Sequence, residues 1–235
     1  MALDKSALIE ALVAVFGSVK ENTSAKDRAK SVAQAIHDYC IGGVPMTQIS
    51  TDSSSVVGSM TAGPVSGSGT GGIDTQSAGS GLEASKLQKD LEDALAPNPT
   101  AKIQATKIGT AIHDYFSKAK VETKDSTDAP LAAPPPVGPV SGSIKGRGGL
   151  NGSSEGSGLS GAKPDLEAAL TEIWSDLSNQ SKKTSAERMG TAIHSFCQKA
   201  KISTEGSFMA LAVVDPITFS GSYMPGMGNG KGTIQ

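Results

Sequence analysis

One six-residue stretch occurs three times in this 235-residue chain. It reads AIHDYC at residues 35–40, AIHDYF at 111–116 and AIHSFC at 192–197, and the copies contain all three histidines of the chain. The histidines are 76 and 81 residues apart. Matches that use every histidine indicate an internal repeat, so the fold has to be predicted one repeat at a time.

Similarity continues on both sides of this motif. An alanine lies eight residues before each histidine, an apolar residue lies five before it, and a threonine lies ten after it. Apolar positions spaced by three or four residues predict an amphipathic helix with one narrow buried stripe. We expect the following motif positions to be structural: Ile36, His37, Tyr39, Ile112, His113, Tyr115, Ile193, His194 and Phe196.

A second helical pattern precedes each motif, with leucines spaced by four residues, as at Leu8 and Leu12. We expect these upstream helices to start at Ser6, at Ser85 and at Pro164, which suit N-cap and first-turn positions. Short connections rich in Asn, Ser and Pro separate the two helices of each repeat. The pattern therefore predicts three antiparallel helical hairpins.

After each hairpin the chain becomes rich in glycine, serine and proline. Residues 63–68 and 138–143 both read GPVSGS, and residues 215–222 read DPITFSGS. Because Pro and Gly weaken strands and confine them to sheet edges, we expect extended arms with short edge strands. The arm residues expected to contact other subunits are Pro64, Val65, Pro139, Val140, Pro216 and Ile217.

These patterns predict an α+β fold made of three tandem repeats, each a helical hairpin followed by an arm. The repeats span residues 1–79, 80–160 and 161–235. With 28 glycines, 12 prolines and 4% aromatic residues, apolar burial is available only in patches, so we expect small packed islands. We expect the arms to become ordered on other subunits.

The composition gives no support for several kinds of partner and anchor. A net charge of −2 gives no electrostatic reason for nucleic acid or an anionic membrane to be the main partner. The N-terminus carries acids among its first apolar residues and does not predict a secretory signal. Its apolar runs are shorter than the roughly 20 residues that a membrane span needs.

Candidate chemistry is sparse. The histidines could supply metal ligands, but each follows a buried Ile, and we favour boundary histidines whose rings bond a backbone carbonyl or a neighbouring helix. The strings GSGTGG at residues 67–72 and GSSEG at 152–156 match a phosphate loop and a nucleophile elbow in letters only, because neither has the required strand and helix around it. We expect no catalytic residue, no cofactor and no metal.

The two cysteines, Cys40 and Cys197, occupy equivalent positions of the repeat. Two cysteines are too few for a secreted disulfide scaffold. We favour reduced, buried thiols, and a bridge between them stays open if their helices touch. The aromatic residues beside the helix stripes, Trp174 among them, are expected in the core or in subunit contacts.

The combination of a helical hairpin, an Ala-Ile-His-Asp-Tyr helix and a Gly-Pro-Val-Ser-Gly-Ser arm resembles virion structural proteins of tailed bacteriophages. The chain looks like three such proteins joined together. The resemblance implies a non-enzymatic structural subunit of a neck, tail, baseplate or capsid surface, made in the host cytoplasm and found in the virion. Its partners would be other virion structural proteins and copies of itself, with hairpins in quasi-equivalent positions and arms on neighbouring subunits.

A different class of function stays open at this point. Three repeated units could act as independent docking sites of a soluble adaptor or of an adhesin-like binding module, which gains avidity from multivalency. An enzyme would require polar residues that differ between the copies and line a common pocket.

Overall fold

A computed structural model of the chain describes residues 4–20, 22–41, 50–55, 64–73, 82–96, 100–129, 140–149, 158–177, 179–214 and 221–233. The helices in these ranges are α1 (Lys5–Ser18), α2 (Ala25–Ile41), α3 (Ala84–Ala94), α4 (Ala101–Ser117), α5 (Leu159–Ser175) and α6 (Lys182–Cys197). The strands are β1 (Ser50–Ser55), β2 (Pro64–Ile73), β3 (Lys120–Ala129), β4 (Val140–Gly149), β5 (Lys201–Val214) and β6 (Gly221–Thr233). Each repeat supplies two helices followed by two strands.

The second helix of each repeat begins at an equivalent residue. Ser24, Thr100 and Ser181 each lie 13 residues before the motif histidine, and each hydroxyl accepts a hydrogen bond from a backbone N–H of the first turn. Such N-caps satisfy donors that the helix itself leaves unpaired. The predicted helical hairpins α1–α2, α3–α4 and α5–α6 are all present.

The six helices close a ring around one core. Besides the contacts within each hairpin, α2 packs against α3, α4 against α5, and α6 returns to α1. The motif isoleucines Ile36, Ile112 and Ile193 are completely buried in a single hydrophobic cluster to which all three repeats contribute. Because apolar burial is the main favourable term in folding, the three repeats depend on one another for stability.

The strands form a backbone ladder that also closes on itself. Consecutive strands pair antiparallel, and β1 pairs with β6, so the order β1-β2-β3-β4-β5-β6 forms a closed barrel. The register places Ser54 opposite Val65 and Ala129 opposite Val140. Because backbone N–H and C=O groups make these bonds, a glycine-rich and serine-rich sequence can form them.

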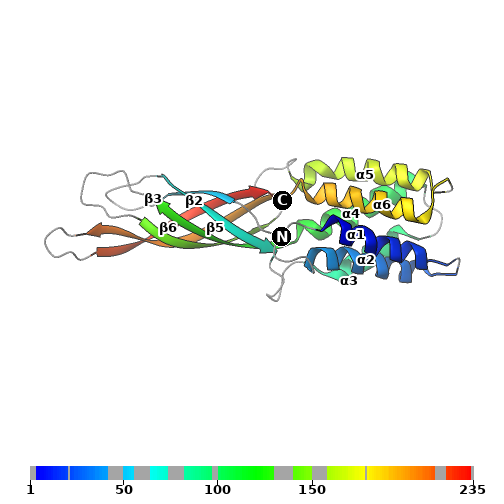
Figure 1. Ribbon diagram of the computed structural model, residues 1–235, viewed down its shortest axis with the longest axis horizontal. Coiled ribbons are helices and arrows are strands. Elements are labelled where there is room, and N and C mark those ends of the chain that lie inside the picture. The colour runs from blue at the N-terminus through cyan, green and yellow to red at the C-terminus, as the bar shows by residue number, and fades with distance from the viewer. Residues whose placement is uncertain are drawn as a thin grey trace.

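Figure 1 shows the helical ring at one end of an elongated molecule and the strands at the other. The helix α1 begins, and the strand β6 ends, near the junction between the two. Each repeat thus runs out and back through the helices, then out and back through the strands. The same path can be repeated three times without a long return connection.

The predicted fold class, α+β with short edge strands on arms, is wrong. Of the residues whose side chains the structure places, 81% lie in six helices and none lie in strands, so this packed part is all-helical. The strands have only their backbone described, and a closed ladder leaves them no edge position. The abundance of Pro and Gly predicted edge strands, because the sequence does not show that β1 and β6 pair with each other and close the sheet.

Three helix starts also differ from the prediction. Helix α1 is capped by the Asp4 side chain rather than started at Ser6, and α3 begins at Ala84 after Glu83. Helix α5 begins at Leu159, which places Pro164 inside the helix. The extra first turn buries Leu159 and Ala162, and this burial offsets the backbone hydrogen bond that proline cannot donate.

Candidate functional site

The motif histidines lie between repeats, where the second helices meet. The Nδ1 atom of His37 is 2.6 Å from the hydroxyl of Tyr115, and the Nδ1 atom of His194 is 2.8 Å from the hydroxyl of Tyr39. Each pair joins the histidine of one repeat to the tyrosine of the next in cyclic order. The prediction that the rings bond a neighbouring helix is confirmed for these two histidines.

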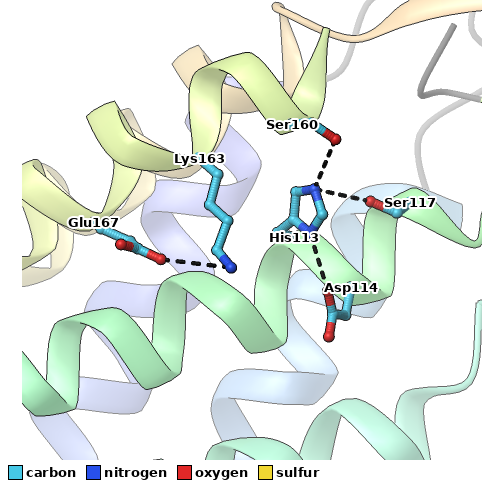
Figure 2. Close-up of polar contacts among 6 residues, drawn as sticks. All are labelled: His113, Asp114, Ser117, Ser160, Lys163 and Glu167. Carbon is cyan, nitrogen blue, oxygen red and sulfur yellow. Dashed lines mark hydrogen bonds and ion pairs between the residues drawn. The ribbon is translucent and has the colours of Figure 1, made fainter. Parts of the chain in front are cut away.

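The third position of this cycle has no phenol. Phe196 occupies the place of the tyrosine, and its ring centroid lies 6.4 Å from that of His113. His113 bonds instead to Asp114 at 3.0 Å and to the hydroxyls of Ser117 and Ser160, both at 3.3 Å (Figure 2). We call the three pairs His37–Tyr115, His194–Tyr39 and His113–Phe196 the junction ring.

The contacts of His113 bring together a serine, a histidine and an aspartate, the residue types of a hydrolytic triad. Their arrangement favours a structural role. The Nε2 atom is shared between two serines at equal distance, and the Asp114 side chain is 50% exposed to water, where electrostatic stabilisation is weak. Phe196 offers His113 no hydroxyl, and the ring nitrogens bond to Asp114, Ser117 and Ser160 instead.

Burial shifts the pKa of three members of the junction ring, His194, Tyr39 and Tyr115. Desolvation lowers the pKa of His194, and the positive charge of Lys5 lowers it further. Desolvation raises the pKa of Tyr39 and of Tyr115. Neutral His194 and protonated Tyr39 are therefore the favoured partners, and their hydrogen bond carries no net charge.

Next to this ring the repeats place Cys40, Phe116 and Cys197 at equivalent positions, three residues after each histidine. Both cysteines are free and buried, as the sequence led us to favour. Burial raises the pKa of each thiol, which keeps the unreactive protonated form. The phenyl ring of Phe116 makes an edge contact with Phe196 at 6.2 Å between centroids.

Small residues set how closely neighbouring repeats approach. Ala33, Gly109 and Gly190 each lie four residues before the motif histidine. A Cβ atom at Gly190 would lie 2.8 Å from Cγ1 of Ile9, and one at Gly109 would lie 2.7 Å from Cγ of Glu167. The α6–α1 and α4–α5 contacts therefore require glycine, whereas the equivalent position of α2 holds the buried Ala33.

At the opposite end of the helical ring lies a cavity of about 340 Å³. All six helices, or the residues that end them, contribute to its wall. Its apolar lining includes Val32, Ile108 and Met189, the equivalent positions five residues before each histidine. We call this space the distal cavity.

Polar residues at the distal cavity were missed from the sequence. Arg28 and Gln104 line it, and Ser185 occupies the third equivalent position, nine residues before the histidine. Buried Nε of Arg28 and buried Oγ of Ser185 have no hydrogen-bond partner among the described residues. The sequence signal for them is that these three positions lie one turn before the apolar ones and differ in every copy. Polar residues that differ between copies are also what an enzyme pocket would require, but none of these three side chains is a general base.

The arm residues are only partly described. Pro64 and Val65 begin β2, where they pair with Ser55 and Ser54, and Val140 begins β4 opposite Ala129. Their described backbone partners lie within the chain. Pro139, Pro216 and Ile217 lie outside the described residues.

Two other kinds of site are absent from the described residues. No described helix has the length and the apolar character needed to cross a lipid bilayer. Within the same ranges, no three His, Cys, Asp or Glu side chains gather where they could hold a metal ion. Each motif histidine contacts an aromatic side chain of a neighbouring helix, so the three imidazole rings do not meet at one point.

Comparison with protein-family models, with curated proteins and with solved structures gives no match for this chain.

Proposed function

We propose that the chain is a non-enzymatic structural subunit of a tailed-phage particle, in a neck, tail, baseplate or capsid surface. The observation that supports this proposal best is the closure of α6 on α1, together with the pairing of β6 with β1. Three similar hairpins arranged around one core are what a trimer of one-hairpin proteins would provide. The chain supplies them as one covalent unit.

Covalent joining has a physical consequence for assembly. Three separate subunits lose translational freedom each time they associate, whereas linked repeats meet at a high effective concentration. A single chain can also make its three interfaces different. In the junction ring His113 bonds to Asp114 where the other two histidines bond to a tyrosine, and the position four residues before each motif histidine holds alanine once and glycine twice. Such a subunit suits a place where a threefold body meets partners that are not threefold.

The partners that we propose are other virion structural proteins and further copies of the chain. The strand barrel leaves no edge for strand addition among its described residues, so contacts would be made by the outer surface and by the hairpin ends of the barrel. Pro64, Val65 and Val140 begin strands at such ends. These residues therefore remain the first candidates for contact with neighbouring subunits.

Deletion of residues 55–80 tests this role in particles. It removes β2 and opens the barrel, and we expect the helices to remain while incorporation into particles is lost. Circular dichroism measures the first and particle sedimentation the second. The exchange Lys183→Glu with Glu187→Lys, on the exposed face of α6, is the control and should leave incorporation unchanged. Incorporation of the deletion variant at the normal level would contradict the proposal.

A separate experiment tests the proposal that the chain is not an enzyme. A fluorophosphonate probe labels activated serines of hydrolases, and we expect no labelling of Ser160 above that of the variant His113→Asn. Labelling of Ser160 that depends on His113 would show that the Ser160–His113–Asp114 contact activates a nucleophile. That result would overturn the structural assignment of this position.

The alternative is a multivalent soluble adaptor or an adhesin-like module. It predicts that binding falls stepwise as repeats are removed. In the structure the repeats share one core, so removal of residues 161–235 should unfold the remaining helices. A truncated chain that stays folded and binds a target with two-thirds of the sites would favour the alternative.

A further inference from the structure

The distal cavity combines apolar walls with positive charge. Arg28 and Lys182 line it, and none of its described lining residues is acidic. Lys182 donates a hydrogen bond from Nζ to the backbone carbonyl of Val19, while the Nε–H of Arg28 is buried and finds no partner in the part of the chain that the structure describes. A buried donor without a partner costs free energy, and more so on a charged group.

The volume and the lining define the size of an occupant. Small-molecule pockets measure about 300–1,000 Å³ and are mostly apolar, with a few placed polar groups. A cavity of about 340 Å³ is at the low end of this range. A polypeptide segment would bring backbone N–H and C=O groups that the side chains of Val32, Ile108 and Met189 cannot bond. The cavity therefore suits a small molecule better than a peptide.

The polar groups also define the chemistry of an occupant. Guanidinium and carboxylate groups form paired, charge-assisted hydrogen bonds. Gln104, on the wall of the cavity, adds an amide N–H that can donate to the same group. Because Arg28, Gln104 and Ser185 differ at equivalent positions, the cavity offers one anion site and not three.

We propose that the distal cavity binds a small amphipathic carboxylate, with its carboxylate at Arg28 and its apolar body among Val32, Ile108 and Met189. This inference goes beyond the structural role and does not depend on it. A ligand at this place contacts all three repeats and stabilises the closed ring by mass action.

The only tryptophan of the chain, Trp174, lines the cavity and reports on it directly. We would titrate the full chain with dodecanoate, below the concentration at which it aggregates, and record tryptophan fluorescence. Dodecanol and dodecyltrimethylammonium serve as neutral and cationic probes of the same chain length. We expect saturable binding of one dodecanoate per chain, at least tenfold tighter than either control probe.

Substitutions separate the charge from the volume. Arg28→Gln should weaken dodecanoate binding at least tenfold and leave dodecanol binding unchanged. Val32→Phe should fill the cavity and abolish binding of both. The control Lys183→Gln changes a lysine of the same helix as Lys182 whose side chain is 73% exposed, and it should bind like the unaltered chain.

Three results would overturn the proposal. They are the absence of a saturable change with dodecanoate, equal affinity for dodecanol, and equal loss of affinity in Arg28→Gln and Lys183→Gln. If Val32→Phe lowers the helical content, the comparison of Arg28→Gln with Lys183→Gln decides by itself.

Discussion

The two ends of the helical ring differ in how alike the three repeats are. Beside the barrel, Ile36, Ile112 and Ile193 are identical and completely buried. At the far end three equivalent positions hold Arg28, Gln104 and Ser185, and Arg28 and Gln104 line the distal cavity. The three isoleucines fill one close-packed layer, whereas the open space at the far end is bordered by side chains of different size and polarity.

The largest expected effect on stability comes from replacing an isoleucine by alanine, and its size should differ between the two ends of the helical ring. Ile112→Ala in the packed layer should lower the free energy of unfolding by about 4 kcal/mol, since it removes a fully buried side chain and leaves a void. Ile108→Ala, one turn away in the cavity wall, should cost about 2 kcal/mol because that side chain already borders empty space. Urea denaturation measures both. Equal losses would show that the distal end is packed as tightly as the other.

Substitutions in the junction ring should have the next largest effect on the free energy of unfolding. Tyr115→Phe removes the hydroxyl that His37 contacts and should cost about 1–2 kcal/mol, because a part-buried ring nitrogen loses its partner. Phe196→Tyr should supply His113 with the missing hydroxyl and gain about 0.5–1 kcal/mol. Thermal unfolding of the single and double variants measures both changes. A gain in Tyr115→Phe would contradict the pairing.

Glycine substitutions test the close helix contacts. Gly190→Ala should destabilise the fold by about 1 kcal/mol, because the clash with Ile9 exceeds the gain in helix propensity. Gly17 is the matched control, since a Cβ there meets no atom within 4 Å. Gly17→Ala should therefore stabilise the chain by about 0.5 kcal/mol. Opposite signs in urea denaturation would confirm the packing of α6 against α1.

The smallest expected effect is one of pH. The pKa of His194 is lowered in the folded chain, so the unfolded chain binds the proton more readily. Stability contributed by neutral His194 is present above the ordinary histidine pKa of about 6.5 and is lost as pH falls through the lowered value. The variant His194→Gln should show a weaker decline in unfolding free energy between pH 7 and pH 5. An unchanged decline would exclude His194 as its source.

The helices could be predicted from the sequence because the apolar residues of each helix recur every three or four positions. The repeat of the AIHDYC motif located α2, α4 and α6, and the spaced leucines located α1, α3 and α5. The start of α5 could not be predicted, since the turn before Pro164 is stabilised by tertiary burial of Leu159. The fold class was missed because the Pro-rich and Gly-rich segments were counted as the strand part of an α+β fold, whereas the part of the chain with placed side chains is all-helical.

The site was predicted in part. The histidines were correctly placed at the edge of a buried stripe, but their phenol partners are 78 and 155 residues distant in the chain. No spacing rule within one repeat points to such partners. Arg28 was missed, because the sequence of a single helix does not show that three equivalent positions converge on one cavity.

Each repeat leaves the junction through a helix and comes back to it through a strand, so the chain enters and leaves every repeat at the same waist of the molecule. The order in which the repeats are encoded is therefore not fixed by the geometry. A circular permutation that begins at α3 and ends with β2 would require only one new short connection, between β6 and α1. The same body would then be built from a different first residue.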